Sequence, residues 1–490
     1  MNTVKEILGL LSDASPEDIA LIKKAYSAAE IAHEGQVRFT GEPYFTHVFE
    51  TAKTLTKLKM DAETIAAGFL HDSIEDERLT EEDVRKEFGD DILFLIQGVT
   101  KLGKLEYHGI KRHAESLRKL FIATSQDMRV LIIRLADRLH NVKTLDGHPK
   151  EEKRKRIAME TLEVFAPLAH RLGMWQLQGE LEDNAFRYAL PEEYKKTKEL
   201  LKNRTKFDEK LMEKVRRALQ TELANHNIKP IQMSYRMKRL YSLYKKILKR
   251  KNIDEIYDFI AIRVIVENVE DCYRTLGIVH KLWKLVPDTI KDYIAMPKPN
   301  GYQSLHTVVF TGDGGIVEIQ IRTEQMHKEA EFGIASHLAY KEVGDSVDKS
   351  HKYKKAPAWI DQILEWQKSV SESGEFLENL KKDFFSDRVF AFTPEGDVID
   401  LPEGSSTIDF AYAIHTDIGE HISGAKINGK MSSLDNILNN GDIVEILTNK
   451  NSHPTSKWLK YTKTTMANRR IKAYLAENDT SIFNFLSKIG

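Results

Sequence analysis

At 490 residues the chain is too long for a single hydrophobic core, and at about 150 residues per domain we expect about three domains in series. Its 41% hydrophobic and 30% charged residues are typical of a globular protein and exclude an intrinsically disordered or membrane-embedded chain. The formal net charge of −1 gives no overall attraction to nucleic acid or anionic lipid, so any polyanion site must come from local clusters of Lys and Arg.

The cysteine content and the hydropathy pattern indicate the compartment. The only cysteine, Cys272, excludes an intramolecular disulfide framework and a thiolate zinc cluster, which fits a reducing environment. The first residues include neither a basic segment nor a long apolar run, and no later stretch approaches the ~18 apolar residues of a membrane span. We therefore expect a cytoplasmic protein without membrane contact.

Helical patterns dominate the first part of the chain. Ser15, followed by Pro16 and two acidic residues, is typical of a helix start with a hydroxyl cap and negative charge near the positive end of the helix dipole. Apolar residues then recur at spacings of three and four along 19–32, 48–58, 62–74, 91–99, 113–123, 127–139 and 153–168. We expect an all-helical domain at 1–190, followed by a Lys/Glu-rich helical linker at 191–225.

The middle of the chain mixes strands with helices. Residues 258–266, 306–311 and 316–321 are β-rich runs, whereas 269–285 has a helical pattern, and Gly, Pro and Asn turns separate these segments. These patterns predict an α+β domain at 226–342.

The C-terminal part is predicted to hold a smaller domain. A polar, Lys-rich stretch begins a segment of linker and helix at 343–385. Two alternating runs around a Pro-Glu-Gly-Asp turn predict a hairpin over 388–401. We expect a β-rich domain at 386–448 and the start of a helical region at 449–490.

Four ionisable residues crowd the end of the predicted helix 62–74. His71 and Asp72 are each followed four residues later by an acidic residue, Glu75 and Asp76, and residues at this spacing are neighbours on a helix. The pattern favours a site with several carboxylates and an imidazole.

A second polar group interrupts an otherwise apolar helix at 127–139 and just beyond it. The stripe consists of Arg134, Asp137, Arg138 and Asn141. A buried helix must provide partners for such a stripe. His47 supplies another imidazole from an upstream helix, and imidazoles and carboxylates from three helices suit a divalent cation such as Mn²⁺. The implied chemistry is metal-assisted phosphoester hydrolysis.

A nucleotide site is predicted in the α+β domain. Strict alternation places Glu318, Gln320 and Arg322 on one face of a strand, and Asp258 begins another strand, so two carboxylates could share one Mg²⁺. Polar alternation is also typical of an ordinary half-exposed strand. The loop at 291–306 adds side chains that suit a purine nucleotide: Lys291, Lys298, Asn300 and Tyr302.

The motifs together resemble those of the RelA/SpoT homologue family. Residues 38–44 (RFTGEPY), 71–76 (HDSIED) and 134–141 (RLADRLHN) are similar to its hydrolase motifs. Residues 257–263, 291–306 and 327–337 are similar to its synthetase core, and 386–448 resembles its small TGS domain. The resemblance covers residues 15–475 and implies an all-helical HD-type hydrolase domain, a nucleotidyltransferase-like synthetase domain and a β-grasp TGS domain. Long members of the family continue into further regulatory domains.

For the hydrolase, the resemblance implies a role for each matching residue. Mn²⁺ would be held by His47, His71, Asp72 and Asp137, and Glu75 and Asp76 would activate the attacking water. Arg38 and Asn141 would grip the nucleotide. Lys101 and Arg138 are weaker candidates, and a salt bridge is an equal alternative for Arg138.

For the synthetase, Asp258 and Glu318 would bind Mg²⁺, with Glu318 also placed to activate the ribose 3′-hydroxyl of GTP or GDP. Tyr302 would stack on guanine, near Asn300 and His306. The other substrate-binding candidates are Lys291, Lys298, Gln320 and Arg322 and, for the ATP phosphates, Arg236, Lys238, Ser242 and Lys246.

Three positions depart from the family pattern. Tyr235 and Met237 stand where the family has Gly and Pro, and Thr289 begins the element that otherwise indicates a preference for GDP or GTP. In the TGS domain, His415 matches a position that would face the tRNA 3′ end, with a buried turn histidine as the alternative.

The resemblance therefore implies a bifunctional enzyme. It would hydrolyse (p)ppGpp to GDP or GTP and pyrophosphate, and would make (p)ppGpp by pyrophosphate transfer from ATP, with possible tRNA or ribosome contact through TGS. The alternatives are a hydrolase with a degenerate synthetase and a tRNA- or ribosome-binding regulator. Because the two reactions oppose each other, we expect reciprocal control through the helical arm near 170–225.

Overall fold

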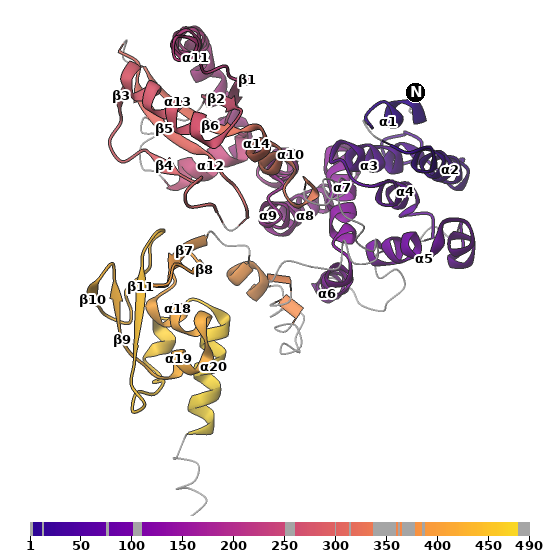
Figure 1. The fold of residues 1–490 in the computed structure, drawn as a ribbon. Helices are drawn as coiled ribbons and strands as arrows, with labels where there is room; N and C mark the ends of the chain where they lie inside the picture. The colour runs from indigo at the N-terminus through magenta and orange to yellow at the C-terminus, as the bar shows by residue number, and fades with distance from the viewer. Residues whose placement is uncertain are drawn as a thin grey trace, which may run out of the picture. The chain divides into compact units, whose positions relative to one another are not determined.

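The computed structural model describes residues 3–11, 14–74, 78–100, 110–249, 260–298, 300–312, 315–336, 359–360, 363–364, 378–384 and 388–478. Two compact units divide the chain, 1–369 and 370–490 (Figure 1). Among the described residues, no helix combines the length and the apolar character that crossing a membrane requires.

The first unit begins with helices, as predicted. They are α1 (Val4–Leu8), α2 (Pro16–Ala32), α3 (Phe45–Lys57), α4 (Ala62–Leu70), α5 (Glu81–Val99), α6 (Ile110–Gln126), α7 (Arg129–Lys143), α8 (Glu151–Glu160), α9 (Ala166–Arg171), α10 (Trp175–Ala189) and α11 (Pro191–Asn225). A 3-10 turn at Leu145–Gly147 and a π-helical turn at Thr161–Phe165 flank α8.

Capping residues define the ends of these helices. Ser15 and Asp18 form a capping box at the start of α2, which confirms the predicted helix start. The helix predicted for 62–74 instead ends at Leu70, and the side chain of the next residue, His71, bonds the Gly68 carbonyl.

A six-stranded sheet forms the rest of the first unit. Its order is β1 (Gln232–Met237), β2 (Ile260–Val266), β6 (Ile316–Thr323), β5 (Leu305–Phe310) and β3 (Lys284–Leu285), and β4 (Lys291–Asp292) also pairs with β5. Strands β2 and β6 are parallel, and the other pairs are antiparallel. Three helices accompany the sheet: α12 (Leu240–Lys249), α13 (Val269–Leu282) and α14 (Glu324–Phe332). This mixed sheet confirms the predicted α+β class.

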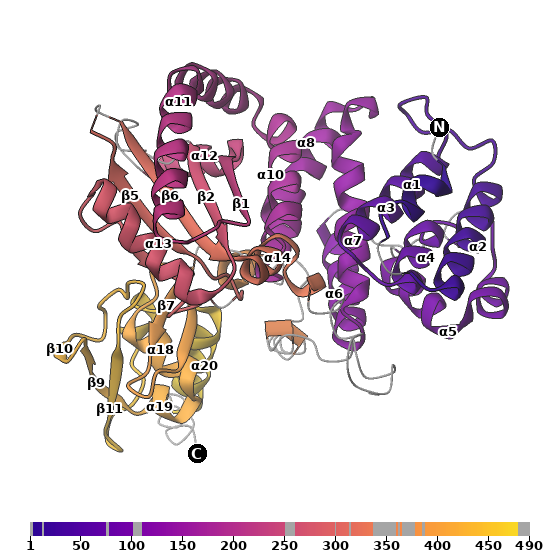
Figure 2. The same ribbon diagram turned by 45° about the horizontal axis from the view of Figure 1, so that its top comes forward.

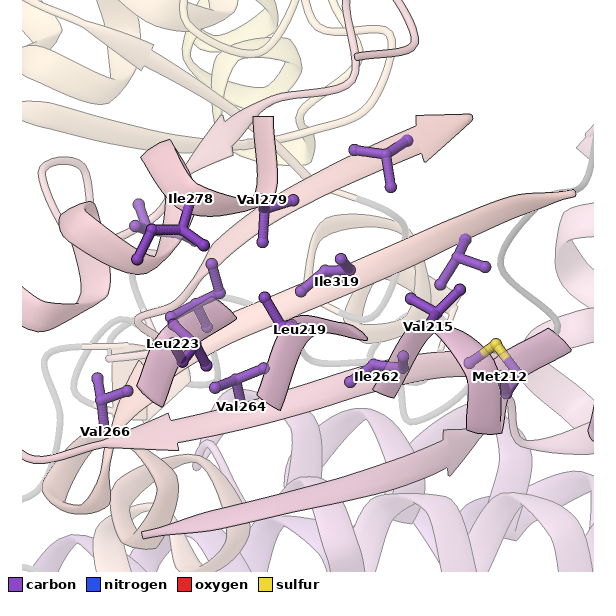
Figure 3. Close-up of a cluster of buried hydrophobic side chains, with 14 of the residues drawn as sticks. Met212, Val215, Leu219, Leu223, Ile262, Val264, Val266, Ile278, Val279 and Ile319 are labelled. Atoms are coloured by element: carbon purple, nitrogen blue, oxygen red, sulfur yellow. The ribbon is translucent and has the colours of Figure 1, made fainter. Parts of the chain in front are cut away.

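The core of this part lies between the sheet and two helices, α11 and α13 (Figure 2). Met212, Val215, Leu219 and Leu223 of α11 lie over the buried side chains of β2 and β6 (Figure 3). The segment 191–225, which was expected to be a helical linker, is one helix whose second half also packs into the sheet core, because its apolar residues recur at helical spacing.

The second unit is a small β-rich fold with helices. Strands β7 (Arg388–Phe392) and β8 (Val398–Pro402) form the predicted hairpin, and β9 (Ile422–Ile427) lies between β10 (Lys430–Ser432) and β11 (Val444–Thr448). Its helices include α18 (Thr407–Ile414), α19 (Thr416–Glu420) and α20 (Thr465–Glu477). Buried Asp409 completes the capping box of α18 with the N-cap Ser406, and it also accepts hydrogen bonds from the amides of Lys463 and Thr464, so the chain beyond β11 is built into this fold.

Candidate metal centre and nucleotide site

Three helices bring His47, His71 and Asp137 together in the helical part of the first unit. His47 lies in α3, His71 directly follows α4 and Asp137 lies in α7, and these helices pack against one another (Figure 1). All three residues are buried, and one ligand atom from each lies within 4.8 Å of the others. This spacing suits a single cation bound between them.

The Asp72 carboxylate lies beside the same imidazoles. Its Oδ2 is 3.4 Å from His47 Nε2 and 3.2 Å from His71 Nε2, and it accepts a hydrogen bond from the Tyr44 hydroxyl at 2.8 Å. Asp137 Oδ1 lies 3.3 Å from His47 Nε2 and 3.9 Å from His71 Nε2. The structure thus gathers His47, His71 and Asp137 around one point, with the Asp72 carboxylate beside the two imidazoles.

The orientation of His71 tests whether this group fits a metal. Its Nδ1 donates to the Gly68 carbonyl at 2.9 Å, so its Nε2 faces the carboxylates. That Nε2 is buried and makes no hydrogen bond to a described residue, which is unfavourable unless a ligand or a cation completes the site. Imidazole nitrogens and carboxylate oxygens, with one buried nitrogen that makes no hydrogen bond within the described part of the chain, fit a divalent cation.

The charges of the cluster also favour a cation. Burial raises the pKa of Asp72, but the neighbouring His71 and His47 hold it well below its usual range, so the carboxylate is ionised. Burial lowers the pKa of His71, and Asp72 and Asp137 outweigh this effect and raise it to about 9. Two buried carboxylates therefore already require positive charge between them.

The predicted nucleotide-gripping residues lie next to the metal cluster. Arg38 Nη2 donates to Asn141 Oδ1 at 2.7 Å, and the Asn141 amide in turn donates to Asp137 Oδ1. Arg38 Nη1 also lies 3.1 Å from Thr144 Oγ1 and 3.0 Å from His140 Nδ1. Burial, followed by His47 and Arg38, lowers the pKa of His140 to about 3, so this imidazole is neutral.

Sequence reasoning missed Tyr44, His140 and Thr144. The sequence spacing could have indicated two of them, because His140 and Thr144 lie three and seven residues after Asp137 and therefore share its helix face. The predicted Glu75 and Asp76 and the weaker candidate Lys101 lie outside the described residues.

Arg138 forms a buried ion pair. Its Nη2 lies 2.9 Å from Glu160 Oε1, and its guanidinium lies over the Phe165 ring at 4.0 Å from the centroid. The two interpretations predicted for Arg138 were contact with the nucleotide and a surface salt bridge. The structure contains a salt bridge, but it lies in the interior.

A chain of hydrogen bonds crosses β1, β5 and β6 in the sheet. Glu318 Oε1 lies 2.8 Å from His306 Nδ1, and His306 Nε2 lies 2.9 Å from the Tyr302 hydroxyl. Gln320 Nε2 donates to Glu318 at 3.2 Å, and Arg236 donates to Gln320 Oε1 at 3.1 Å. The structure thus brings together five predicted site residues, while Asp258 lies outside the described residues.

Lys298 lies among aromatic rings beside this chain. Its Nζ is 4.6 Å from the ring centroid of Tyr293, 5.3 Å from that of Tyr302 and 5.5 Å from that of Trp175. Burial, with Lys291 and Arg236, lowers the pKa of Lys298 to about 8. A partly buried cation next to aromatic rings is suited to bind phosphate near a nucleobase.

The end of the helical part covers the tyrosine of this site. Trp175, the first residue of α10, lies 5.3 Å from Tyr302 between ring centroids, and Tyr302 is only 5% exposed. The Asn300 amide donates to the His170 carbonyl at 3.2 Å. A side chain at Gly333 would collide with the backbone at Leu172, so the two parts are in close contact.

Arg322 lies beneath the site. It is 1% exposed, its guanidinium lies 6.0 Å from the Tyr302 ring centroid, and its Nη2 lies 3.4 Å from Glu331 Oε1. Arg263 shares the same carboxylate at 3.2 Å. The structure therefore places Arg322 under Tyr302, away from solvent.

The predicted ATP residues follow one another along the edge of the sheet. Arg236 lies in β1, Lys238 follows this strand, and Ser242 and Lys246 lie one turn apart on α12, all partly exposed. This arrangement can present several donors to phosphates.

The departures from the family pattern have defined positions. The Tyr235 hydroxyl donates to Glu213 of α11, and Met237 is 59% exposed. The Thr289 hydroxyl donates to the Val286 carbonyl at 2.6 Å and supports a turn. Tyr235 thus joins β1 to α11, whereas Thr289 bonds a residue only three positions away.

In the second unit, His415 caps α19. Its Nδ1 accepts a hydrogen bond from the Asp417 amide at 3.2 Å, and the residue is exposed. The alternative of a buried turn histidine is therefore wrong, because the residue lies at an open helix end.

Comparisons with known families match three segments of the chain. Residues 25–175 match the HD domain, residues 235–345 the region found in RelA/SpoT proteins, and residues 389–448 the TGS domain.

Several characterised proteins are similar along most of the chain. A GTP pyrophosphokinase from Myxococcus xanthus is 46% identical over 94% of this chain, and a guanosine-3′,5′-bis(diphosphate) 3′-pyrophosphohydrolase from Aquifex aeolicus is 44% identical over 97%. The bifunctional (p)ppGpp synthase/hydrolase SpoT of Escherichia coli is 43% identical over 95%. The chain spans 61%, 68% and 66% of the lengths of these three relatives.

A solved structure of small alarmone synthetase 1 from Bacillus subtilis, bound to its product pppGpp, is 25% identical. The match covers 36% of this chain and 96% of that one, with a TM-score of 0.24.

Proposed function

Because the chain belongs to the RelA/SpoT family, we propose that it is a bifunctional alarmone enzyme. In the helical domain at 1–190 it hydrolyses (p)ppGpp to GDP or GTP and pyrophosphate, with Mn²⁺ as the cation. In the domain at 226–342 it makes (p)ppGpp by transfer of pyrophosphate from ATP to GDP or GTP, with Mg²⁺. The observation that carries the proposal is the convergence of His47, His71 and Asp137 on one point.

The hydrolase residues divide into two groups. His47, His71, Asp72 and Asp137 would hold Mn²⁺, which when bound polarises the phosphoester and lowers the pKa of a bound water. Arg38 and Asn141 form a cationic and polar edge next to this group and would hold the phosphates and ribose. Glu75 and Asp76 would take up the proton of the attacking water.

In the synthetase, Glu318 is the proposed general base. It would accept the proton of the 3′-hydroxyl as the 3′-oxygen bonds the β-phosphorus of ATP and AMP leaves. His306 holds the Glu318 carboxylate through Nδ1 and the Tyr302 hydroxyl through Nε2, so one residue aligns the base and the stacking ring. Mg²⁺ would be held by Asp258 and Glu318, and the cations Arg236, Lys238, Lys246, Lys291 and Lys298 would neutralise the transferred group.

Reciprocal control would operate at the contact between the two parts. A guanine base can stack on Tyr302 only after Trp175 moves, because the tyrosine is 5% exposed and Trp175 lies against it. Trp175 begins α10, and α10 packs on α7, which carries Asp137. We therefore propose that binding at one site alters the other through α10.

The second unit would contact tRNA or the ribosome. Its match to a TGS domain and the exposed position of His415 support this part of the proposal. Loss of tRNA-dependent stimulation of synthesis in His415→Ala would test it.

The experiment that tests the proposed function uses the purified chain with two reaction mixtures. One contains Mn²⁺ and ppGpp, and the other contains Mg²⁺, ATP and GDP, with nucleotides separated by chromatography. We expect GDP and pyrophosphate from the first mixture and ppGpp and AMP from the second. A wild-type chain without the first pair of products is not a hydrolase, and one without the second pair is the degenerate synthetase.

A further inference from the structure

We propose that His140 is a positioning residue that fixes the tautomer of His47, so that His47 Nε2 offers its lone pair to the cation. The inference rests on the metal-dependent hydrolase function proposed above. It concerns a residue behind the metal cluster that does not itself touch the cation.

The evidence begins with two imidazole nitrogens in contact. His47 Nδ1 lies 2.8 Å from His140 Nδ1, and both residues are buried, with 2% and 7% exposure. At this distance one nitrogen must carry the proton and the other must accept it. The distance alone does not say which nitrogen is the donor.

Arg38 decides the direction of this hydrogen bond. Its Nη1 lies 3.0 Å from the same His140 Nδ1, and a guanidinium can only donate. If His140 Nδ1 carried a proton, two N–H groups would face each other. His140 Nδ1 is therefore the acceptor, and His47 Nδ1 is the donor.

This assignment decides which nitrogen of His47 can bind a cation. An imidazole that ligates a metal is neutral and carries one proton, so a proton on Nδ1 would leave the lone pair on His47 Nε2, the atom that lies 3.3 Å from Asp137 Oδ1 and 3.4 Å from Asp72 Oδ2. The opposite direction would place the proton on Nε2, where it would point into the metal cluster and prevent coordination. The hydrogen bond between His47 Nδ1 and His140 Nδ1 thus leaves His47 Nε2 available to the cation.

The second imidazole of the cluster is oriented in the same way by a different partner. His71 Nδ1 donates to the Gly68 carbonyl at 2.9 Å, which leaves its Nε2 toward the carboxylates. Backbone carbonyls and carboxylates are the usual partners behind a metal-binding histidine. In His47 a second imidazole, held by an arginine, takes that place.

The position of His140 fits this indirect role. It lies on α7, three residues after Asp137, so one helix carries a ligand and the residue that orients another ligand. Its Nδ1 is already used by His47 and Arg38. Since Arg38 also borders the predicted nucleotide site, the same guanidinium connects substrate contacts to the orientation of His47.

The test measures Mn²⁺ binding by isothermal titration calorimetry, apart from turnover. His140→Leu fills the same space without an acceptor, and we expect it to weaken Mn²⁺ binding about 10- to 100-fold, the usual cost of losing such a partner. His140→Asn and His140→Asp place an oxygen near Nδ1, so we expect both to bind more tightly than His140→Leu. A purely structural role would not follow acceptor strength in this way.

Thr144→Val is the matched control. It removes another hydrogen-bond partner of Arg38 Nη1 from the same end of α7 but leaves the contact between His47 and His140, so we expect wild-type Mn²⁺ affinity. Thermal unfolding without metal verifies that each variant is folded. If His140→Leu does not fold, His140→Asn and His140→Asp are compared with the Thr144→Val control. Mn²⁺ affinities of both variants that lie more than tenfold below that of the control would contradict the inference.

The outcomes separate this inference from the proposed function. Equal Mn²⁺ affinity in folded His140→Leu and wild type would overturn the role of His140 and leave the hydrolase in place. A wild-type chain that neither binds Mn²⁺ nor cleaves ppGpp would overturn both.

Discussion

The metal cluster and the nucleotide site are built by different means within the first unit. The cluster consists of buried side chains from α3, α4 and α7, and its histidines are held from behind by Gly68 and His140. The nucleotide site lies along one sheet, and Trp175 from the helical part covers its tyrosine. The difference teaches that the first site is formed by the packing of one helical core, whereas the second combines residues of the sheet with a residue of the helical part that covers its tyrosine.

The largest expected effect is on the cluster. Asp137→Asn removes a carboxylate from among the imidazoles, and we expect hydrolysis of ppGpp to fall at least about 100-fold, because a catalytic cation contributes several kcal/mol. Synthesis should persist. The exposed Asp91→Asn on α5 is the control and should change neither activity. Parallel assays of both reactions measure the effect, and hydrolysis at the wild-type rate in Asp137→Asn would contradict the metal assignment.

The reverse separation is expected in the sheet. Glu318→Gln keeps the shape of the side chain but cannot take up a proton, so synthesis should fall about 100-fold or more while hydrolysis continues. Initial rates of AMP release from ATP in the presence of GDP measure this. Synthesis that survives the substitution would require another base.

A smaller effect is expected where the two parts meet. Trp175→Ala uncovers Tyr302, so we expect the KM for GDP in synthesis to fall about fivefold, the lower end of usual coupling between sites. Trp175→Phe keeps a ring over the tyrosine and should stay near wild type. An unchanged KM in Trp175→Ala would show that the covering ring does not limit nucleotide binding.

The smallest effect is confined to alkaline pH. Burial, Lys291 and Arg236 lower the pKa of Lys298 to about 8, so its ammonium is charged below this pH and loses its charge as the pH rises through it. Synthesis should therefore decline above about pH 8. Lys298→Arg stays charged throughout and should lose this decline, measured as kcat/KM for GDP against pH. The same alkaline limb in both proteins would assign it to another group.

The sequence was most informative where periodicity and capping act locally. The capping box at Ser15 and the alternation in β6 predicted elements that the structure contains. The end of α4 at Leu70 was not predictable, because residues 71–74 include no Gly or Pro that would mark a helix end. The packing of α11 on the sheet was also missed, since helical periodicity identifies an apolar face but not what covers it.

The site was predictable as a set of residues but not as a network. Motif positions placed His47, His71 and Asp137 in one group, although they come from distant segments. The contacts that orient them, such as His140 behind His47 and Tyr44 on Asp72, depend on tertiary geometry. The covering of Tyr302 by Trp175 likewise arises from the contact between two parts of the unit.

The most direct test of the metal centre is a crystal of the wild-type chain grown with Mn²⁺, with X-ray data collected on both sides of the manganese absorption edge. We predict an anomalous peak between His47 Nε2, His71 Nε2 and Asp137 Oδ1. Absence of a peak there, in a chain that hydrolyses ppGpp with Mn²⁺, would contradict the central claim that this buried cluster is the hydrolytic metal site.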